Sequence, residues 1–176
     1  AAGDTIYVDK GIFDSFVTVS PTETAGINIT KDSLTIIGKD SGATVINPVG
    51  DSGDVGDKLY YGIYADTQVN LTIRNLGVTD AYDGLHFDNV DNSRVDSTSS
   101  TWNGRYGVYV LSSSDTNIFR SNTSSNNGSY GFYLQNSSNN TLSQNTADSN
   151  AAYAFYIDGA GSSDTFSKNV FAPSPY

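Results

Sequence analysis

One short segment gathers the residue types that acid–base catalysis uses, around the only histidine of the chain. It reads Asp83-Gly-Leu-His86-Phe-Asp88-Asn-Val-Asp91, so His86 lies among three carboxylates. Imidazole and carboxylate groups with neighbouring charges are the usual proton donors and acceptors of enzymes. If the chain has a catalytic site, we expect it at His86 and Asp88, together with Asp66, which the repeat described below places one rung earlier.

A second group of carboxylates suggests a metal ion. Asp51, Asp54 and Asp57 follow one another at intervals of three residues in a glycine-rich loop. Ca²⁺ prefers oxygen ligands in flexible surroundings, and this loop supplies both. The segment lacks the EF-hand pattern, so the alternative is a solvated turn. We expect calcium to be at most a stabiliser of this loop, and we expect no other cofactor.

The charge of the chain argues against nucleic-acid binding. Its 176 residues include 19 acidic residues and nine Lys or Arg, which gives a net charge of -10 and a pI near 4.1. Binding to a phosphate backbone requires the opposite sign of surface charge. Cysteine is absent, which excludes thiolate metal sites and disulfides. No apolar run approaches the roughly 18 residues of a membrane span, so none is expected.

Several features indicate export. The chain contains no methionine and begins Ala-Ala, which is what cleavage after an Ala-x-Ala signal leaves. We therefore expect a mature extracellular or cell-surface protein. Six Asn-x-Ser/Thr sequons agree with that location as candidate glycosylation sites: Asn28, Asn70, Asn122, Asn127, Asn136 and Asn139.

The elements that must position these residues form an internal repeat of 22 to 24 residues. One column of the repeat holds small residues, namely Gly62, Gly84, Gly107, Gly131 and Ala154. A second column holds apolar residues, namely Ile73, Val95, Phe119, Leu142 and Phe166. Two further columns hold asparagine, the first with Asn122, Asn145 and Asn169 and the second with Asn103, Asn127 and Asn150.

Between these columns, short runs of alternating apolar residues are separated by Asn, Asp, Ser and Gly, as in short strands joined by tight turns. A unit of about 23 residues without a helix cannot bury its apolar face alone, so successive units must stack. The sequence therefore predicts an all-β solenoid of parallel strands, with about seven rungs, as a single domain over residues 1–176. Residues 1–60 fit less regularly and carry an inserted loop near 47–58, whereas 61–171 form regular rungs.

Strand alternation then predicts an aromatic ladder on the outside of one sheet. If Ile63 and its equivalents point inward, the next residue of each repeat points outward. These outward residues are Tyr64, His86, Tyr109, Tyr133 and Tyr156. Stacked aromatic side chains either stabilise neighbouring rungs or offer a flat surface for sugar rings or for lateral contact with another copy. The asparagine columns are expected to be structural, because stacked amides hydrogen-bond along the stack.

The chain resembles a known group of proteins. Gly3-Asp-Thr-Ile-Tyr-Val-Asp-Lys-Gly-Ile-Phe13 and Leu34-Thr-Ile-Ile-Gly38 are similar to the first rungs of pectin-lyase-like right-handed parallel β-helices. The asparagine-rich stretches 117–127 and 139–150 resemble the NosD-type repeats of microbial surface and periplasmic proteins. The resemblance covers nearly the whole chain and implies a single-stranded right-handed β-helix. It specifies no activity, because this fold hosts lyases, hydrolases, epimerases, adhesins and surface-layer proteins.

The resemblance supplies no complete active site. Polygalacturonases of this fold combine an Asn-x-Asp, an Asp pair, a Gly-His-Gly and an Arg-x-Lys, whereas this sequence has only Asn89-Val-Asp91 and the Gly-x-His at Gly84. No Lys or Arg stands in the outward ladder beside His86 as a lyase would need, which makes catalysis the less favoured interpretation. The arginines, which could neutralise a uronate, are spread over different rungs: Arg74, Arg94, Arg105 and Arg120. Copper delivery, which NosD proteins suggest, is disfavoured by a single His without Met or Cys.

The ends of the solenoid lead to the functional prediction. An open end exposes apolar core and unpaired strand edges, and the sequence shows no amphipathic helix that would cover them. We expect Ile6 and Phe171 to lie at these ends. Either the chain is a piece of a larger protein, or other copies cover these ends. The first interpretation is therefore a secreted structural protein that packs with its own copies into a cell-surface layer, sheath or filament. The alternative is a carbohydrate-binding or polysaccharide-processing β-helix that works through the tyrosine ladder.

Overall fold

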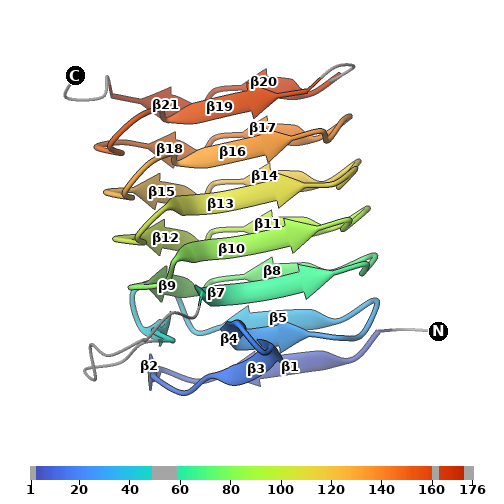
Figure 1. Cartoon of the computed structure of the whole chain (residues 1–176), viewed down its shortest axis with the longest axis vertical. Coiled ribbons are helices and arrows are strands. Elements are labelled where there is room, and N and C mark those ends of the chain that lie inside the picture. The colour runs from blue at the N-terminus through green and yellow to red at the C-terminus, as the bar shows by residue number, and fades with distance from the viewer. Residues whose placement is uncertain (1–2, 49–58, 160–162, 173–176) are drawn as a thin grey trace.

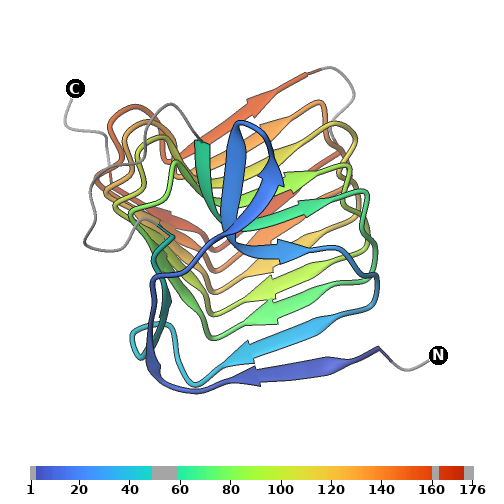
Figure 2. The same cartoon turned by 60° about the horizontal axis from the view of Figure 1, so that its bottom comes forward.

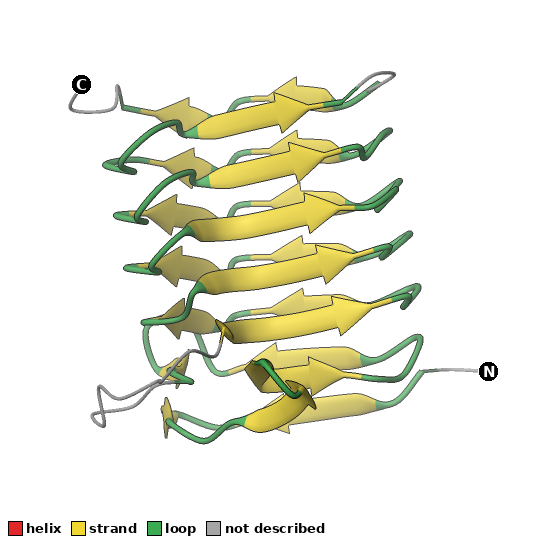
Figure 3. Cartoon of the chain, in the orientation of Figure 1, coloured by secondary structure: helices red, strands yellow, loops and turns green. Residues whose placement is uncertain are grey.

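The chain winds into a right-handed parallel β-helix (Figure 1). The structure, a computed structural model, describes residues 3–48, 59–159 and 163–172. Three sheets run along the solenoid, each of seven strands, and the described residues contain no helix (Figure 3). The all-β fold and the seven rungs that the sequence predicts are confirmed.

The strands of each sheet stack in the order of the rungs. Sheet A contains β1 (Thr5–Val8), β5 (Thr35–Gly38), β8 (Thr72–Arg74), β11 (Arg94–Asp96), β14 (Ile118–Arg120), β17 (Thr141–Ser143) and β20 (Thr165–Ser167). Sheet B contains β2 (Gly11–Phe13), β6 (Thr44–Ile46), β9 (Gly77–Thr79), β12 (Ser99–Thr101), β15 (Thr123–Ser125), β18 (Thr146–Ala147) and β21 (Val170–Phe171). Sheet C contains β3 (Val17–Ser20), β4 (Glu23–Ile29), β7 (Leu59–Asp66), β10 (Asp83–Asp88), β13 (Tyr106–Leu111), β16 (Phe132–Gln135) and β19 (Phe155–Asp158).

The core is a set of apolar columns, one of which is the column that the repeat predicts. Its members lie opposite one another in sheet A: Ile73, Val95, Phe119, Leu142 and Phe166. The strand register extends this column to Ile36 and Ile6. The middle members are fully buried, whereas Ile6 is 48% and Phe166 40% exposed because no further rung covers them in the described part of the chain.

The glycine column has a steric cause. A Cβ atom on Gly84 would lie 1.8 Å from Ser100 Oγ, and one on Gly107 would lie 1.8 Å from Ser124 Oγ. Both serines are buried, and Ser100 donates a hydrogen bond to the carbonyl of Gly107 and Ser124 to that of Gly131, each at 2.7 Å. An alanine at Gly84 or Gly107 would therefore displace a buried hydrogen-bonded serine.

Buried amides hold the three corners between the sheets. At the corner between sheets A and B, Asn145 Oδ1 accepts from the N–H of Asn122 at 2.9 Å, and its Nδ2 donates to the carbonyl of Phe119 at 2.9 Å. Similar hydrogen bonds link the predicted column between sheets B and C, which holds Asn103, Asn127 and Asn150. A third column, which was not predicted, lies between sheets C and A and holds Asn117, Asn140 and Asp164.

The first rungs differ from the prediction in one element. The sequence predicts parallel strands throughout, but β3 pairs antiparallel with β4 in a hairpin. This hairpin ends sheet C at the N-terminal end, which Figure 2 brings forward. The inserted loop expected near 47–58 falls mostly on residues 49–58, outside the described residues.

Trp102 occupies a backbone position that does not suit it. It lies in the turn after β12 with φ of 60° and is 65% exposed, while the equivalent residues of the adjacent rungs are Asp80 and Asn126. The left-handed conformation costs most L-residues roughly 1–2 kcal/mol, and Asn and Asp less. We expect Trp102→Asn to raise the free energy of unfolding by about 1 kcal/mol, or Tm by roughly 3 °C.

Urea denaturation monitored by circular dichroism would measure this change. Asn126→Trp is the reciprocal control, because it places the same ring in the same turn one rung later and should destabilise the protein by a similar amount. A lower stability for Trp102→Asn would show that the indole makes contacts whose value exceeds the backbone strain.

Candidate functional site

The predicted aromatic ladder lies on the outer face of sheet C, in the register that the repeat indicates. Each member is paired with the next one: Tyr64, His86, Tyr109, Tyr133 and Tyr156. Neighbouring ring centroids are 4.9 to 5.3 Å apart along the whole ladder. These distances are those of favourable aromatic pairs, so the ladder stabilises the stack of rungs.

A second row of tyrosines covers the middle of the ladder. Tyr106 lies 5.0 Å from Tyr109 between centroids, and Tyr130 lies 5.3 Å from Tyr133. His86, Tyr109 and Tyr133 are consequently only 6 to 8% exposed. The second row therefore leaves little of these three rings open to a sugar ring or to another copy.

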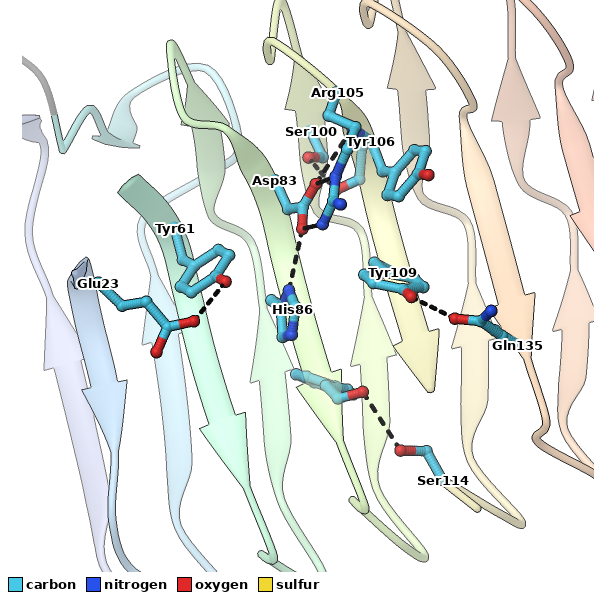
Figure 4. A network of polar contacts seen from close by, with 12 residues as sticks. Glu23, Tyr61, Asp83, His86, Ser100, Arg105, Tyr106, Tyr109, Ser114 and Gln135 are labelled. Carbon is cyan, nitrogen blue, oxygen red and sulfur yellow. Dashed lines mark hydrogen bonds and ion pairs between the residues drawn. The ribbon is translucent and has the colours of Figure 1, made fainter. Parts of the chain in front are cut away.

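A buried carboxylate takes the place of one tyrosine in this second row. Asp83 is completely buried, and both of its oxygens accept hydrogen bonds from Arg105, from Nε at 2.8 Å and from Nη2 at 2.5 Å. His86 Nδ1 lies 2.9 Å from the same carboxylate (Figure 4). A buried carboxylate with a bidentate arginine partner is a strong charge-assisted pair, so Asp83 anchors two rungs to each other.

Aromatic rings enclose the arginine of this pair. The guanidinium carbon of Arg105 lies 4.4 Å from the ring centroid of Tyr82 and 4.3 Å from that of Tyr106. Burial alone would lower the pKa of Arg105, but the hydrogen bonds and the charge of Asp83 raise it above its ordinary value. Arg105 therefore stays charged and paired, and it is not available to a ligand.

Several tyrosine hydroxyl groups donate hydrogen bonds to carboxylate or amide oxygens. Tyr61 donates to Glu23 Oε1 at 2.9 Å, Tyr133 to Asp158 at 3.3 Å, and Tyr109 contacts Gln135. Burial, and then the hydrogen bond to Glu23, raise the pKa of Tyr61 above its ordinary value. Burial and the charge of Asp66 raise the pKa of Tyr64 to about 12. These phenols are protonated at any physiological pH.

The structure brings two of the three acid–base candidates together. Asp66 and Asp88 are direct partners on β7 and β10, and partial burial and the charge of Asp88 raise the pKa of Asp66. Two adjacent carboxylates, one of them with a raised pKa, are an arrangement that acid–base chemistry can use. His86 does not complete the site, because its side chain is 8% exposed and its Nδ1 is engaged by Asp83.

The predicted calcium ligands Asp51, Asp54 and Asp57 lie outside the described residues. In the part of the chain that the structure describes, no three His, Cys, Asp or Glu side chains are grouped so as to hold a metal ion. The same residues include no helix long and apolar enough to cross a membrane.

The six sequons divide into two classes. Asn122 and Asn127 are 2% exposed, and their amide nitrogens donate to the carbonyls of Val95 and Ser100. Because they belong to the corner columns, the folded chain does not present them for glycosylation, which corrects the expectation for these two. The others are at least partly exposed and remain candidates: Asn28, Asn70, Asn136 and Asn139.

Comparison with known proteins places the chain in a family and a fold. The family model described as "Periplasmic copper-binding protein (NosD)" matches residues 3–174. No curated protein sequence matches. Pectate lyase Pel9A is structurally similar, with a TM-score of 0.75, 15% identity and coverage of 98% of this chain and 46% of the lyase.

Two further solved structures share the fold at 16% identity and cover 95% of this chain. They are the catalytic domain of a GH87 α-1,3-glucanase in complex with tetrasaccharides, with a TM-score of 0.70, and ORF18 of Geobacillus virus E2, with a TM-score of 0.68. The chain spans 34% and 33% of these structures. At such identities the similarity shows the β-helix fold alone.

Proposed function

We propose that this chain, which belongs to the NosD family described as periplasmic, is an exported structural β-helix whose copies stack end to end. The observation that supports the proposal is where apolar surface is exposed. Of the large hydrophobic residues that are exposed, all but Trp102 lie in the first or last rung of the described chain. They are Ile6, Tyr7, Ile12, Phe13, Phe16 and Val17 at one end, and Tyr153, Ile157, Phe166, Val170 and Phe171 at the other.

The two ends are complementary in their core columns. Phe166 ends the column of sheet A that Ile6 begins, and Phe171 ends a column of sheet B that Phe13 begins. A hollow of about 730 Å³ lined by Phe155, Phe166 and Phe171 opens at the C-terminal end. An apolar surface from the first rung of another copy would fill it and remove this area from water.

The hydrogen-bond ladders are complementary as well. At the C-terminal end of the solenoid, β20 and β21 are the edge strands of sheets A and B. At the N-terminal end, the edge strands of these sheets are β1 and β2. All four pair in parallel with their neighbours. Docking one end on the opposite end of the next copy would pair these edges. Such a head-to-tail contact extends into a filament unless its rotation happens to close a ring.

The family description names copper, but the donor set of this chain does not fit that metal. Copper sites use imidazole, thiolate and thioether groups, whereas this chain has one histidine and neither cysteine nor methionine. His86 Nδ1 is held by Asp83, and its ring lies 4.3 Å from that of Tyr61 between centroids. We therefore assign no copper chemistry to the chain.

The carbohydrate-binding alternative finds no open platform on the covered tyrosine ladder. The glucanase and the pectate lyase that share the fold process polysaccharides, as their names state. Neither similarity, at 15 to 16% identity, carries that activity to this chain. Polysaccharide binding is instead considered below on a different face of the solenoid.

End-to-end stacking is tested by sedimentation velocity and negative-stain microscopy over a range of protein concentrations. We expect wild-type protein to form concentration-dependent linear oligomers. Ile6→Asp and Phe171→Asp each place a charge at one end of a core column and should leave folded monomers, because an unpaired charge would be buried at the contact.

Trp102→Asn is the matched control, because Trp102 is 65% exposed, like Phe171 at 66%, but lies in a middle rung. It should assemble as wild type does. A wild-type protein that stays monomeric at high concentration, or oligomers that persist in both end variants, would overturn the proposal. Circular dichroism of each variant separates loss of assembly from loss of folding.

A further inference from the structure

Three of the four arginines of the chain gather on the outer face of sheet A. Arg74, Asp96 and Arg120 are direct partners on β8, β11 and β14, and Arg94 lies two residues before Asp96 on the same strand. Together with small polar residues of the following turns they line a groove of about 300 Å³. The groove is lined by three arginines and one aspartate, so its local charge is positive although the net charge of the chain is -10.

The single aspartate does not neutralise the outer arginines. Asp96 Oδ2 pairs with Arg94 Nε, and Oδ1 accepts no hydrogen bond from the described residues. Arg74 is exposed and has no hydrogen-bond or ion-pair partner within the described chain. Arg120 uses only Nε, which donates to Gln144 Oε1 at 3.0 Å, so its terminal nitrogens are available. Two guanidinium groups therefore face solvent with unused donors.

The spacing of these groups indicates the ligand. Arg74 and Arg120 are two strands apart in one sheet, which is roughly 9.6 Å at a strand spacing of about 4.8 Å. The anionic groups on alternate residues of an extended acidic polysaccharide recur at a similar separation along one side of the polymer. Guanidinium forks suit carboxylate and sulfate groups, because they donate two parallel hydrogen bonds.

We propose that this arginine groove binds an anionic polysaccharide that lies along the solenoid axis across β8, β11 and β14. The site uses the side of the β-helix rather than its ends, so it goes beyond end-to-end stacking and does not depend on it. The remaining negative charge of the protein is screened beyond about 8 Å at physiological salt, so the local charge decides binding.

Isothermal titration with a hexagalacturonate tests the site, with a sulfated hexasaccharide to identify the anionic group and a neutral cellohexaose as the uncharged control. Wild-type protein should bind at least one of the anionic oligosaccharides and not the neutral one. Arg74→Gln and Arg120→Gln should each weaken binding by about fivefold, and the double variant by about twentyfold. Asp96→Asn should strengthen binding severalfold, because it removes the competing carboxylate while keeping its shape.

Lys39→Gln is the matched control for net charge, because it removes one positive charge from an exposed position outside the groove. It should bind as wild type does. Equal weakening by Lys39→Gln, unchanged binding in the double arginine variant, or no binding of either anionic oligosaccharide would overturn the proposal. Equally tight, arginine-dependent binding of a single-stranded oligonucleotide would also overturn it, since the groove would then recognise any polyanion.

Discussion

Replacing Asp83 with asparagine should lower the free energy of unfolding by about 3–5 kcal/mol, because removing one partner of a buried ion pair leaves the other uncompensated. Asp83 is completely buried and is the only carboxylate that Arg105 contacts among the described residues. In the variant the guanidinium would stay between tyrosine rings without a counter-charge. Urea denaturation followed by circular dichroism measures the change.

A double-mutant cycle separates the pair from its surroundings. Arg105→Met leaves Asp83 buried without its cation and should be destabilising too, while the combined Asp83→Asn, Arg105→Met variant should lose less than the two single changes added together. Asp66→Asn, an exposed carboxylate two rungs from Arg105, is the control and should not be destabilising. A loss below about 0.5 kcal/mol in Asp83→Asn, typical of a surface change, would contradict the anchoring role.

The register of the solenoid could be predicted because one physical requirement recurs in every rung. Phe119 and Leu142 fall in one column at a spacing of 23 residues, and the structure pairs them directly. The same spacing also predicts the residues that line the arginine groove. Each of them directly follows a member of that apolar column: Arg74, Asp96 and Arg120. The repeat places these arginines on separate rungs, but strand alternation also places them on one outer face of sheet A.

The sequence indicates the antiparallel pairing of β3 with β4 only weakly. Ser20-Pro-Thr-Glu23 separates the two antiparallel strands by two residues. Proline fits the first central position of a tight turn, but the expectation of parallel rungs outweighed it. A single hairpin does not repeat, so the periodic pattern could not indicate it.

The covered ladder and the Asp83 anchor could not be derived from spacing alone. Alternation predicts that Tyr109 points outward, which the structure confirms, but whether water reaches it depends on how Tyr106 and Tyr130 lean across the sheet. The contact of Arg105 with Asp83 likewise depends on side-chain conformations across 22 residues of chain. Outward orientation and exposure are separate properties when large side chains line both rows.

The tyrosine layer should make the protein unfold cooperatively in alkali. Burial is the main cause that raises the pKa values of Tyr61, Tyr109 and Tyr133. In the unfolded chain tyrosine ionises near pH 10, so above that pH the folded state binds more protons than the unfolded state. Stability therefore falls as pH rises, by up to about 1.4 kcal/mol per pH unit for each such tyrosine until its folded pKa is reached. Below pH 10 these groups contribute no pH dependence.

Parallel titrations of phenolate absorbance and circular dichroism measure this behaviour. We expect the part of the phenolate signal that comes from the buried tyrosines to change together with circular dichroism in one steep transition between about pH 10 and 12, since the buried phenols ionise only when the chain unfolds. Exposed tyrosines such as Tyr7 and Tyr153 add a separate gradual change that does not require unfolding. Tyr133→Phe removes one of them while keeping its ring in the stack and should move the midpoint to higher pH. Tyr7→Phe, at a position that is 78% exposed, is the control and should leave it unchanged. Gradual ionisation of all the tyrosines without loss of structure would show that the phenols of the ladder are open to solvent, and the tyrosine ladder would again be a candidate binding surface.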